Sequence, residues 1–436
     1  MIIAGTGIRD ISPRKPAFLV GYPHKERTST GIHDPLLASA LYLQNEKTGI
    51  IIIAIDILQI DPQTARKLRR TISDQAHIPE SHVFISCTHT HSGPVTIEMI
   101  AWKDDPVVPK PDDEYMRYFE DRVIDSAIEA LNNKRPAEIA CTIAHVEGVG
   151  GNRLSPDGIS DPEIGIILVR DLAKKKIFAI SIIYSMHPTV LHEDSTLVSA
   201  DFPGYMRTHI HENLGDDVTI LYHTGPSGNQ SPRYSVRSQT FEEAGRLGRI
   251  LGEAVTTAIT GIRSEDFWQD AVLDGRIESI SLPARQMPTI SEAKEALKQR
   301  IADYERLKIE KANRSAIRSA ECAVFGAEET LTLARCQENG ELEQKIRAYM
   351  PADVQVLRVG DCFLAGLPGE IFVEYGLQIK SQSSSKAFVI SLVNGDLQGY
   401  IATPEAVAAG SYEANNSLFD ITSGSIVTDA ALKLIN

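Results

Sequence analysis

The feature that most constrains the fold is an unbroken apolar run, Gly49 to Asp56 (GIIIIAID). A run so rich in β-branched residues is typical of a strand covered on both faces, because a strand with one face in water alternates apolar and polar residues. A helix signal follows, since Asp61 can cap a helix that has Pro62 in its first turn and continues to about Ala76. A second strand, His82 to Cys87, completes a β–α–β unit with a parallel strand pair.

The rest of the chain continues this alternation, which predicts an α/β fold: a mixed, partly parallel sheet core flanked by helices. A helix capped by Asp112 should reach Asn132, and another should cover 241–259, where Gly248 and Gly252 allow a second backbone to come close. The segment 291–337 is densely charged, and we expect a helical hairpin inserted in a single large domain, 1–436. We expect this hairpin to be a solvated surface without a binding function. Further strands are predicted near 164–169, 177–184, 218–223, 354–364 and 387–393.

The charge balance argues against a nucleic-acid partner. The chain has 44 basic and 58 acidic residues and a net charge of −14, whereas nucleic acid or an anionic membrane requires a basic face. A local basic pocket is compatible with this balance. No apolar run reaches the roughly 18 residues that span a bilayer. Arg9 and Asp10 also interrupt the stretch where a signal peptide needs apolar residues, so we expect a cytoplasmic protein without a transmembrane segment. The oligomeric state is left open.

The histidines and cysteines point to different roles. The five cysteines show no CxxC spacing and are expected to be inert, buried thiols. All twelve histidines lie in the first 223 residues, and three of them follow predicted strands: His89 and His91 in THTHSGP, and His187 in MHPT. Imidazoles at the ends of neighbouring strands can share a metal ion, leaving positions for a carboxylate and a water. Glu370 in LPGE and Asp201 in SADFPG are the candidate carboxylates.

Two further loops contain residues suited to a polar site. The loop GPSGNQSPR, 225–233, presents Asn229, Ser231 and Arg233, and it is a poor phosphate cradle because no GK[ST] follows. The glycine-rich turn GGNRLSP contains Arg153, which has no obvious acidic partner nearby in the sequence. Such an arginine is suited to bind an oxyanion only if the other loops surround it.

Seven short motifs occur in the order in which the neutral (non-lysosomal) ceramidase family has them, and the chain resembles that family. Each motif alone is weak, but seven in register form a strong similarity that covers nearly the whole chain, from GIHDPLLASAL at 31–41 to YEANNSLF at 412–419. The motifs are THTHSGP at 88–94, NRLSP at 152–156, MHPT at 186–189, SAD with GY in 199–205, GNQSP at 228–232, PGE at 368–370, and GY followed by YE in 399–413.

The resemblance implies a zinc amidohydrolase that cleaves an N-acyl bond, as in ceramide, into an amine and a fatty acid. By motif, the zinc ligands would be His89, His187, Glu370 and Tyr400. A tyrosine ligand is physically reasonable because zinc lowers the pKa of the phenol from about 10.

The resemblance also implies roles for residues around the metal. His91 would contact the reacting water or the leaving group. Arg153 and Tyr412 would face the carbonyl oxygen, where a cation and a phenol O–H stabilise a developing oxyanion. His33 and Asn229 would contact the substrate.

Ser231 occupies the position often assigned as the nucleophile of the family, so two mechanisms stay open. In one, zinc lowers the pKa of its bound water to about 7 and this water attacks the carbonyl, while Ser231 positions the substrate. In the other, Ser231 attacks and requires a base within hydrogen-bond reach. We favour the zinc-bound water because the metal generates a nucleophile unaided.

Several departures from the family pattern bear on the substrate. Val95 to Ile97 replace a more glycine-rich stretch, Leu154 is inserted in the arginine motif, and GNQSPR replaces an acidic form. The family also typically has a secretion signal or membrane association and a C-terminal immunoglobulin-like domain, and we expect neither here. We therefore expect a soluble acyl compound to be turned over better than long-chain ceramide, the sphingolipid substrate of the family. The alternatives are a zinc esterase, lactonase or isomerase acting on a small, sugar-derived compound, and a catalytically idle metal-binding relative.

Overall fold

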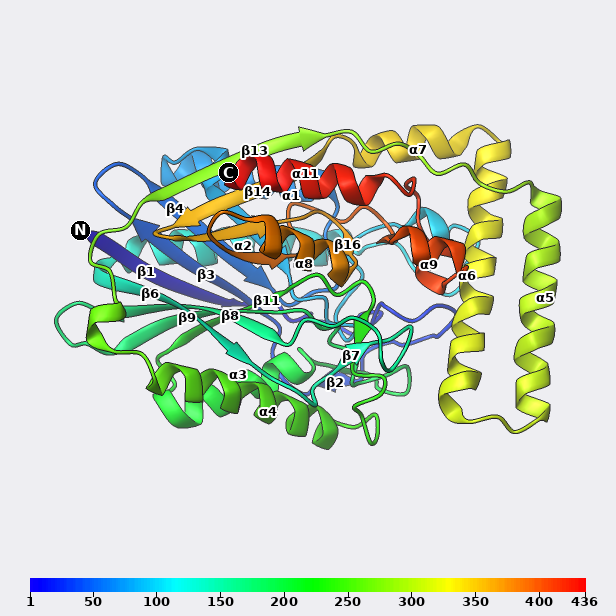
Figure 1. The fold of residues 1–436 in the computed structure, drawn as a ribbon, viewed down its shortest axis with the longest axis horizontal. Helices are drawn as coiled ribbons and strands as arrows, with labels where there is room; N and C mark the ends of the chain where they lie inside the picture. The colour runs from blue at the N-terminus through cyan, green and yellow to red at the C-terminus, as the bar shows by residue number, and fades with distance from the viewer.

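The computed structural model describes all 436 residues and arranges them in four layers, with two β-sheets stacked between two layers of helices (Figure 1). The larger sheet has eight strands and the smaller sheet has four. In spatial order the larger sheet consists of β11 (Thr219–Thr224), β9 (Ile177–Tyr184), β8 (Glu163–Asp171), β6 (Arg135–His145), β1 (Ile2–Asp10), β3 (Leu37–Gln44), β4 (Gly49–Ile55) and β5 (Val83–Cys87). The smaller sheet consists of β13 (Leu273–Ile280), β14 (Ala352–Val359), β15 (Cys362–Gly366) and β17 (Lys386–Ile390).

The predicted strand at the apolar run shows how the layers form. In β4, Ile51 and Ile53 pack toward the helices, whereas Ile50 and Ile52 face the core between the two sheets. Both faces are buried, which explains why the run does not alternate with polar residues. The prediction of a mixed, partly parallel sheet core is confirmed.

Helices cover the two outer faces, and the N-caps predicted for two of them are confirmed. The side chains of Asp61 and Asp112 accept hydrogen bonds from the first turns of α1 (Pro62–Ala76) and α2 (Asp113–Asn132). A Cβ at Gly248 would lie 2.5 Å from a backbone oxygen, so glycine allows α3 (Phe202–Leu214) to pack closely on α4 (Phe241–Thr260). The outer face of the smaller sheet is covered by α8 (Val373–Gln382), α7 (Glu341–Tyr349) and α11 (Ser423–Ile435).

The strands β5 and β9, which precede His89 and His187, are not neighbours, so that prediction was wrong. The strand β5 lies at one edge of the large sheet, and β9 lies next to the opposite edge. The sheet curls as well as twists along its eight strands, and this brings its two edges toward each other. As a result β11 contacts β3, β4 and β5. The segment 391–394 joins the two edges, since Ser391 N donates to Thr224 O and Asn394 N donates to Ile85 O.

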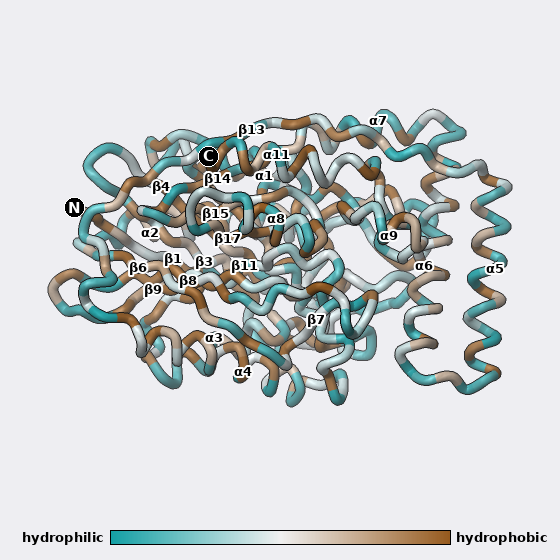
Figure 2. The backbone as a smooth tube through the Cα atoms, in the orientation of Figure 1, coloured by the Kyte–Doolittle hydropathy of each residue, from teal (hydrophilic) through white to brown (hydrophobic).

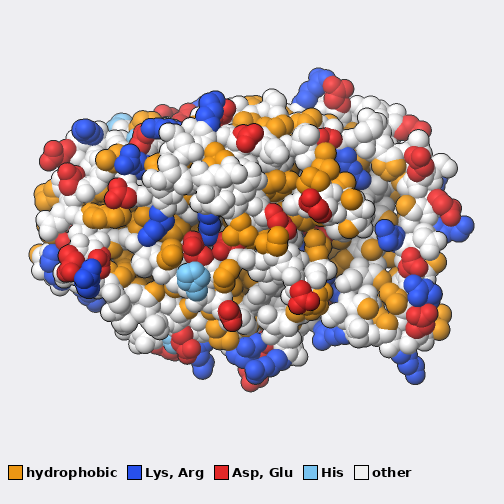
Figure 3. Space-filling model, viewed as in Figure 1, with side chains coloured by type: hydrophobic (Ala, Val, Ile, Leu, Met, Phe, Trp, Pro, Cys, Tyr) orange, Lys and Arg blue, Asp and Glu red, His pale blue; other side chains and the backbone are white.

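The predicted hairpin is present at one end of the molecule as α5 (Ile290–Ile309) and α6 (Arg314–Glu338) (Figure 1). Helix α5 is largely hydrophilic, and acidic and basic side chains are interleaved over it (Figures 2 and 3). Helix α6 differs, because Leu331 and Leu333 in its C-terminal half are buried in the core of the smaller sheet. The expectation of a solvated surface is therefore confirmed for α5 and wrong for α6.

Short elements gather near the ends of the strands. Three pairs of two-residue strands form there, and two of them carry residues of the candidate site. None of the helices combines the length and the apolar character that crossing a bilayer requires. The short elements are β2 (Gly31–Ile32), β7 (Gly151–Asn152), β10 (Leu197–Val198), β12 (Gln230–Ser231), β16 (Glu370–Ile371), β18 (Tyr400–Ile401), α9 (Pro404–Ala408), α10 (Tyr412–Asn415), and 3₁₀ turns at Glu80–His82, Ile100–Trp102 and Ser264–Asp266.

Candidate metal and active site

Two imidazoles and one carboxylate converge at the centre of the site. His89 Nε2 lies 3.1 Å from His187 Nε2, and Glu370 Oε2 lies 3.3 Å and 3.0 Å from these two nitrogens. The Nδ1 atoms face backbone carbonyls, at 2.9 Å from Leu58 O for His89 and 2.7 Å from Ser227 O for His187. A carbonyl only accepts hydrogen bonds, so each Nδ1 carries a proton and each Nε2 is left to face the others.

This donor set fits a divalent metal ion such as zinc. Ligands at about 2.0–2.1 Å from a tetrahedral zinc ion lie about 3.3–3.4 Å from one another, close to the separations found here. Burial raises the pKa of Glu370, but the two imidazoles outweigh burial and hold it well below its ordinary value. Burial and Arg153 lower the pKa of His187 to about 4, so its Nε2 is an unprotonated lone pair that points at an anion. A cation between these groups satisfies all of them at once.

The backbone positions these side chains in two ways. His89 follows β5 in a left-handed conformation, with φ of 69°, which is uncommon for a residue other than glycine and is often found at functional sites. Glu370 and Tyr400 are direct partners in the parallel pair of β16 and β18, so their side chains leave the same face of that pair. The register therefore places the tyrosine hydroxyphenyl group beside the carboxylate.

His91 adds a third imidazole. It offers a ring nitrogen that, with one from His89 and one from His187, forms a group whose members all lie within 4.8 Å of one another. Its Nδ1 lies 3.0 Å from Gly21 O, and its buried Nε2 has no hydrogen-bond partner. Burial and the two neighbouring histidines hold the pKa of His91 well below its ordinary value. His91 therefore presents an unprotonated nitrogen beside those of His89 and His187.

Arg153 does have an acidic partner, which lies far away in the sequence. Its Nε donates to Glu413 Oε1 at 2.7 Å, and both side chains are buried. The motif YE contains Glu413, but sequence analysis gave this residue no role. Arg153 Nη2 is buried without a partner, and the guanidinium carbon lies 5.1 Å from the centre of the Tyr400 ring. The Tyr400 and Tyr412 rings are 6.0 Å apart, so the arginine and both tyrosines form one group.

A cleft of about 410 Å³ lies between α6 and the rest of the domain, and it is lined by His91, Arg153, Tyr400 and Tyr412 among others. Ser231 also lines it, and its Oγ accepts a hydrogen bond from Arg233 N at 3.3 Å. Ser231 makes no hydrogen bond to an imidazole or a carboxylate that would remove its proton. The lining residues are Gly21, Tyr22, Pro23, His91, Arg153, Thr189, His192, Ser231, Arg233, Val236, Arg237, Ser238, Gln239, Arg314, Ser315, Arg318, Cys322, Phe325, Tyr400 and Tyr412.

The remaining candidates lie outside this cleft. His33 is on the surface, where its ring stacks on Phe241 at 3.9 Å between ring centres. Asn229 is buried, and its Oδ1 accepts from Val373 N while its Nδ2 donates to Glu374 Oε2 at 2.8 Å, at the start of α8. Asp201 caps α3 by accepting from Phe202 N and also accepts from Leu191 N, and burial raises its pKa to about 7. Of the two candidate carboxylates, Glu370 is the one beside the histidines.

Other residues of the cleft had no role in the sequence analysis. They include Arg237 in the loop after β12 and Arg314, Arg318 and Cys322 on α6. The helical hairpin thus supplies one wall of the site. The expectation of buried thiols is confirmed for Cys87, Cys336 and Cys362, but Cys141 and Cys322 are only partly buried, and Cys322 faces this cleft.

Comparison with known proteins is consistent across sequence and structure. The curated neutral ceramidase of Pseudomonas aeruginosa is 22% identical over 457 aligned positions, which cover 92% of this chain and 66% of that protein, so the chain spans just under two thirds of its length. A solved ceramidase complexed with C2 superposes with a TM-score of 0.76 at 16% identity, over 99% of this chain and 75% of the other. The crystal structure of the neutral ceramidase from Pseudomonas aeruginosa gives 0.75 at 17% identity, over 99% and 74%.

The fold is therefore shared with these solved ceramidases. The sequence profile described as neutral/alkaline non-lysosomal ceramidase, N-terminal, matches residues 3–223, which is half of the chain. The resemblance seen in the seven motifs is confirmed. The chain belongs to the neutral/alkaline non-lysosomal ceramidase family.

Proposed function

We propose that the protein is a zinc-dependent hydrolase that cleaves an N-acyl bond. The observation that carries this proposal is the buried set of His89, His187 and Glu370, whose facing atoms lie 3.0–3.3 Å apart. The set lies beside Arg153, which has one unpartnered N–H group at the cleft. Membership of a family that contains neutral ceramidases supports the choice of an amide bond.

The metal ligands in this proposal are His89, His187, Glu370 and Tyr400. Tyr400 is assigned to the fourth position because it is the strand partner of Glu370. A bound zinc ion lowers the pKa of a coordinated water to about 7 and polarises the acyl carbonyl. The chain orients the imidazoles through the Leu58 and Ser227 carbonyls, as supporting carbonyls do at metal sites generally.

His91 moves the proton in this scheme. The Gly21 carbonyl holds the ring proton on Nδ1, so Nε2 accepts a proton from the attacking water and then gives it to the nitrogen of the leaving amine. The oxygen of the water joins the acyl carbon, and the carbon–nitrogen bond breaks. The products are a carboxylic acid and an amine, and His91 returns to its starting state.

Arg153 and Tyr412 stabilise the negative charge that develops on the carbonyl oxygen. Arg153 donates through Nη2, while the ion pair with Glu413 fixes the guanidinium plane. Burial holds the pKa of Tyr412 well above its ordinary value, so its hydroxyl keeps the proton that it donates. Ser231 positions the substrate in this scheme. Asn229 shapes the 225–233 loop from outside the cleft, and His33 has no direct contact with the reacting group.

The test is hydrolysis by the purified chain of a panel of soluble N-acyl, ester and lactone compounds together with detergent-dispersed long-chain ceramide. We expect release of the amine from a soluble N-acyl compound, loss of this activity with a chelator, and recovery with zinc. Turnover of an ester or lactone but of no N-acyl compound would support a hydrolase with the same site residues that cleaves a different bond. A fully metal-loaded protein that hydrolyses none of the compounds would contradict the proposal.

A further inference from the structure

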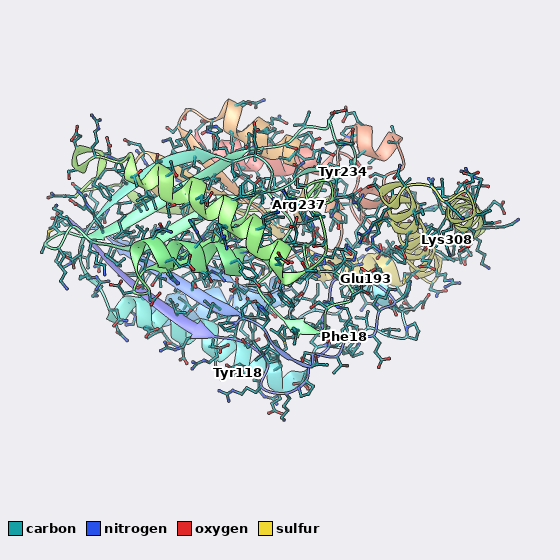
Figure 4. The ribbon with its side chains drawn as sticks, turned by 90° about the horizontal axis from the view of Figure 1, so that it is seen from below. Phe18, Tyr118, Glu193, Tyr234, Arg237 and Lys308 are labelled. Carbon is teal, nitrogen blue, oxygen red and sulfur yellow. The ribbon has the colours of Figure 1, made fainter.

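The cleft is strongly cationic in an acidic protein. Its lining contains five arginines and no aspartate or glutamate, although the chain as a whole carries a net charge of −14. Arg153 lies at the floor beside the metal ligands. Arg233 and Arg237 come from the loop after β12, and Arg314 and Arg318 come from the first turns of α6. Figure 4 shows Arg237 on the side of the body that faces the hairpin.

Three of these arginines have no carboxylate partner. Of the five arginines, only Arg153 and Arg318 form ion pairs, and the latter contacts both Glu193 and Glu321. Arg233 donates to a backbone oxygen at 3.1 Å, and Arg314 donates to Gln239 Oε1 at 2.6 Å. Neutral acceptors leave the positive charge uncompensated, so the cleft retains an excess of positive charge that is available to a ligand.

The start of α6 opposes the usual preference of helices. The N-terminus of a helix has a partial positive charge and favours acidic residues, as in α2, which begins with Asp113 and Glu114. Helix α6 has no acidic residue in its first turn and begins with Arg314. Arg314 and Ser315 both line the cleft. The Asn313 side chain caps this helix and Gln239 accepts a hydrogen bond from Arg314, but both partners are neutral, so the positive charge at this end of α6 is available to an anion.

We propose that the substrate carries an anionic group, a carboxylate or a phosphate, which binds between Arg237 and Arg314 while the scissile carbonyl faces Arg153. This inference rests on the proposed hydrolase function and adds the class of substrate. Guanidinium groups bind carboxylates and phosphates through paired hydrogen bonds, and a neutral ceramide offers no such group. The anionic group takes no part in bond cleavage, so it contributes binding and orientation only.

The experiment compares pairs of compounds in which one member carries an anionic group and the other is neutral. N-octanoylglycine is measured against N-octanoylglycinamide, and N-octanoylethanolamine phosphate against N-octanoylethanolamine. We expect the anionic member of at least one pair to have a kcat/KM about tenfold or more above its neutral partner, falling as salt is added. The two pairs distinguish a carboxylate from a phosphate.

Variants locate the effect. In the double variant Arg237→Gln/Arg314→Gln, KM for the preferred anion should rise about tenfold or more, while its neutral partner changes less than about twofold. Arg249→Gln on α4 is the matched control, because it removes one exposed positive charge outside the cleft. The inference would be overturned if the neutral compounds were cleaved as efficiently as both anions. It would also be overturned if the double variant affected both members of a pair equally.

A binding measurement separates this inference from the proposed function. Should no compound be cleaved, the hydrolase proposal fails, and calorimetry with the same four compounds still decides the question of charge. Binding of an anionic compound that is lost in the double variant and kept in Arg249→Gln supports the inference. Absence of binding by both anions, or equal binding of neutral and anionic partners, overturns it.

Discussion

The floor of the cleft, which comprises Arg153 and the neighbouring His89, His187 and Glu370, is held in place by buried hydrogen bonds. Its rim, by contrast, consists of a loop with Arg237 and a helix end with Arg314, both of which water reaches. At the floor, backbone carbonyls orient His89 and His187, and Glu413 orients Arg153. At the rim, Arg237 and Arg314 are exposed and have no carboxylate partner. A rigid floor can fix the geometry of bond cleavage, while an adaptable rim can change with the substrate. Changes at the floor should therefore affect turnover, and changes at the rim should affect substrate choice.

The largest effect is expected when the negative charge of Glu370 at the floor is removed. Glu370→Gln keeps the shape of the side chain but removes the anion from the metal ligands, so metal content should fall to less than about a tenth of an equivalent per chain and activity by about 10⁴-fold or more. Elemental analysis after dialysis measures the metal. Arg249→Gln should retain the metal content of the original protein. Full metal occupancy in both Glu370→Gln and His187→Ala would show that the metal site is assigned to the wrong residues.

The next effect concerns the charge that faces the carbonyl oxygen. Arg153→Ala should lower kcat by about 10²–10³-fold with metal retained, because one oxyanion donor is lost. It also leaves Glu413, which is 2% exposed, without its partner, so the free energy of unfolding should fall by about 3–5 kcal/mol. The double variant Arg153→Met/Glu413→Leu removes both charges and should regain stability without regaining turnover. Recovery of turnover in that double variant would mean that Arg153 acts only through folding.

The two helices of the hairpin provide a third test, on stability. Leu333 in α6 is fully buried, and Leu333→Ala should reduce the free energy of unfolding by about 2–5 kcal/mol. Ile309 at the end of α5 is 81% exposed, and Ile309→Ser should change it by no more than about 0.5 kcal/mol. Denaturant unfolding of both variants measures the difference. Similar values for the two would contradict the distinction between a buried α6 and a solvated α5.

The smallest effect is expected at Ser231, where floor and rim meet. Ser231→Ala should lower turnover by about tenfold or less with metal retained, because no base contacts this hydroxyl and its role is positioning. Mass spectrometry of rapidly quenched reactions detects an acyl group on the protein. An acyl-enzyme on Ser231, together with complete loss of turnover in the variant, would replace the water mechanism with the serine mechanism.

Local signals in the sequence were sufficient for most of the fold. The caps at Asp61 and Asp112 and the apolar run in β4 depend on neighbouring residues, and all three were found as predicted. The meeting of the sheet edges depends on twist accumulated over eight strands, which leaves no signal in any one of them. For this reason the relation between β5 and β9 was mispredicted.

The site shows the same division between local and long-range information. Motifs identified His89, His187 and Glu370, because each lies next to a turn with a recognisable sequence. The partner of Arg153 lies 260 residues away, so composition around the arginine contained no sign of Glu413. The cationic rim combines a loop near 233–239 with the start of α6, and only the docking of that helix brings the two together. Charge patterning alone predicted a solvated surface for α6.

Helix α6 is anchored in the core by its C-terminal half, and its N-terminal half extends from this anchor. Apolar contacts hold it from Gly326 onward, whereas the turns that begin at Arg314 are attached by polar side chains. At 1.5 Å per residue the twelve residues from Arg314 to the anchor extend about 18 Å, so a tilt of the helix by about 5° at Gly326 moves its N-terminal end by about 1.5 Å. A hydrogen bond tolerates only about 0.5 Å. We therefore expect small volume changes around Leu331 to alter the width of the cleft, which would link the size of the group it accepts to packing in a distant part of the same helix.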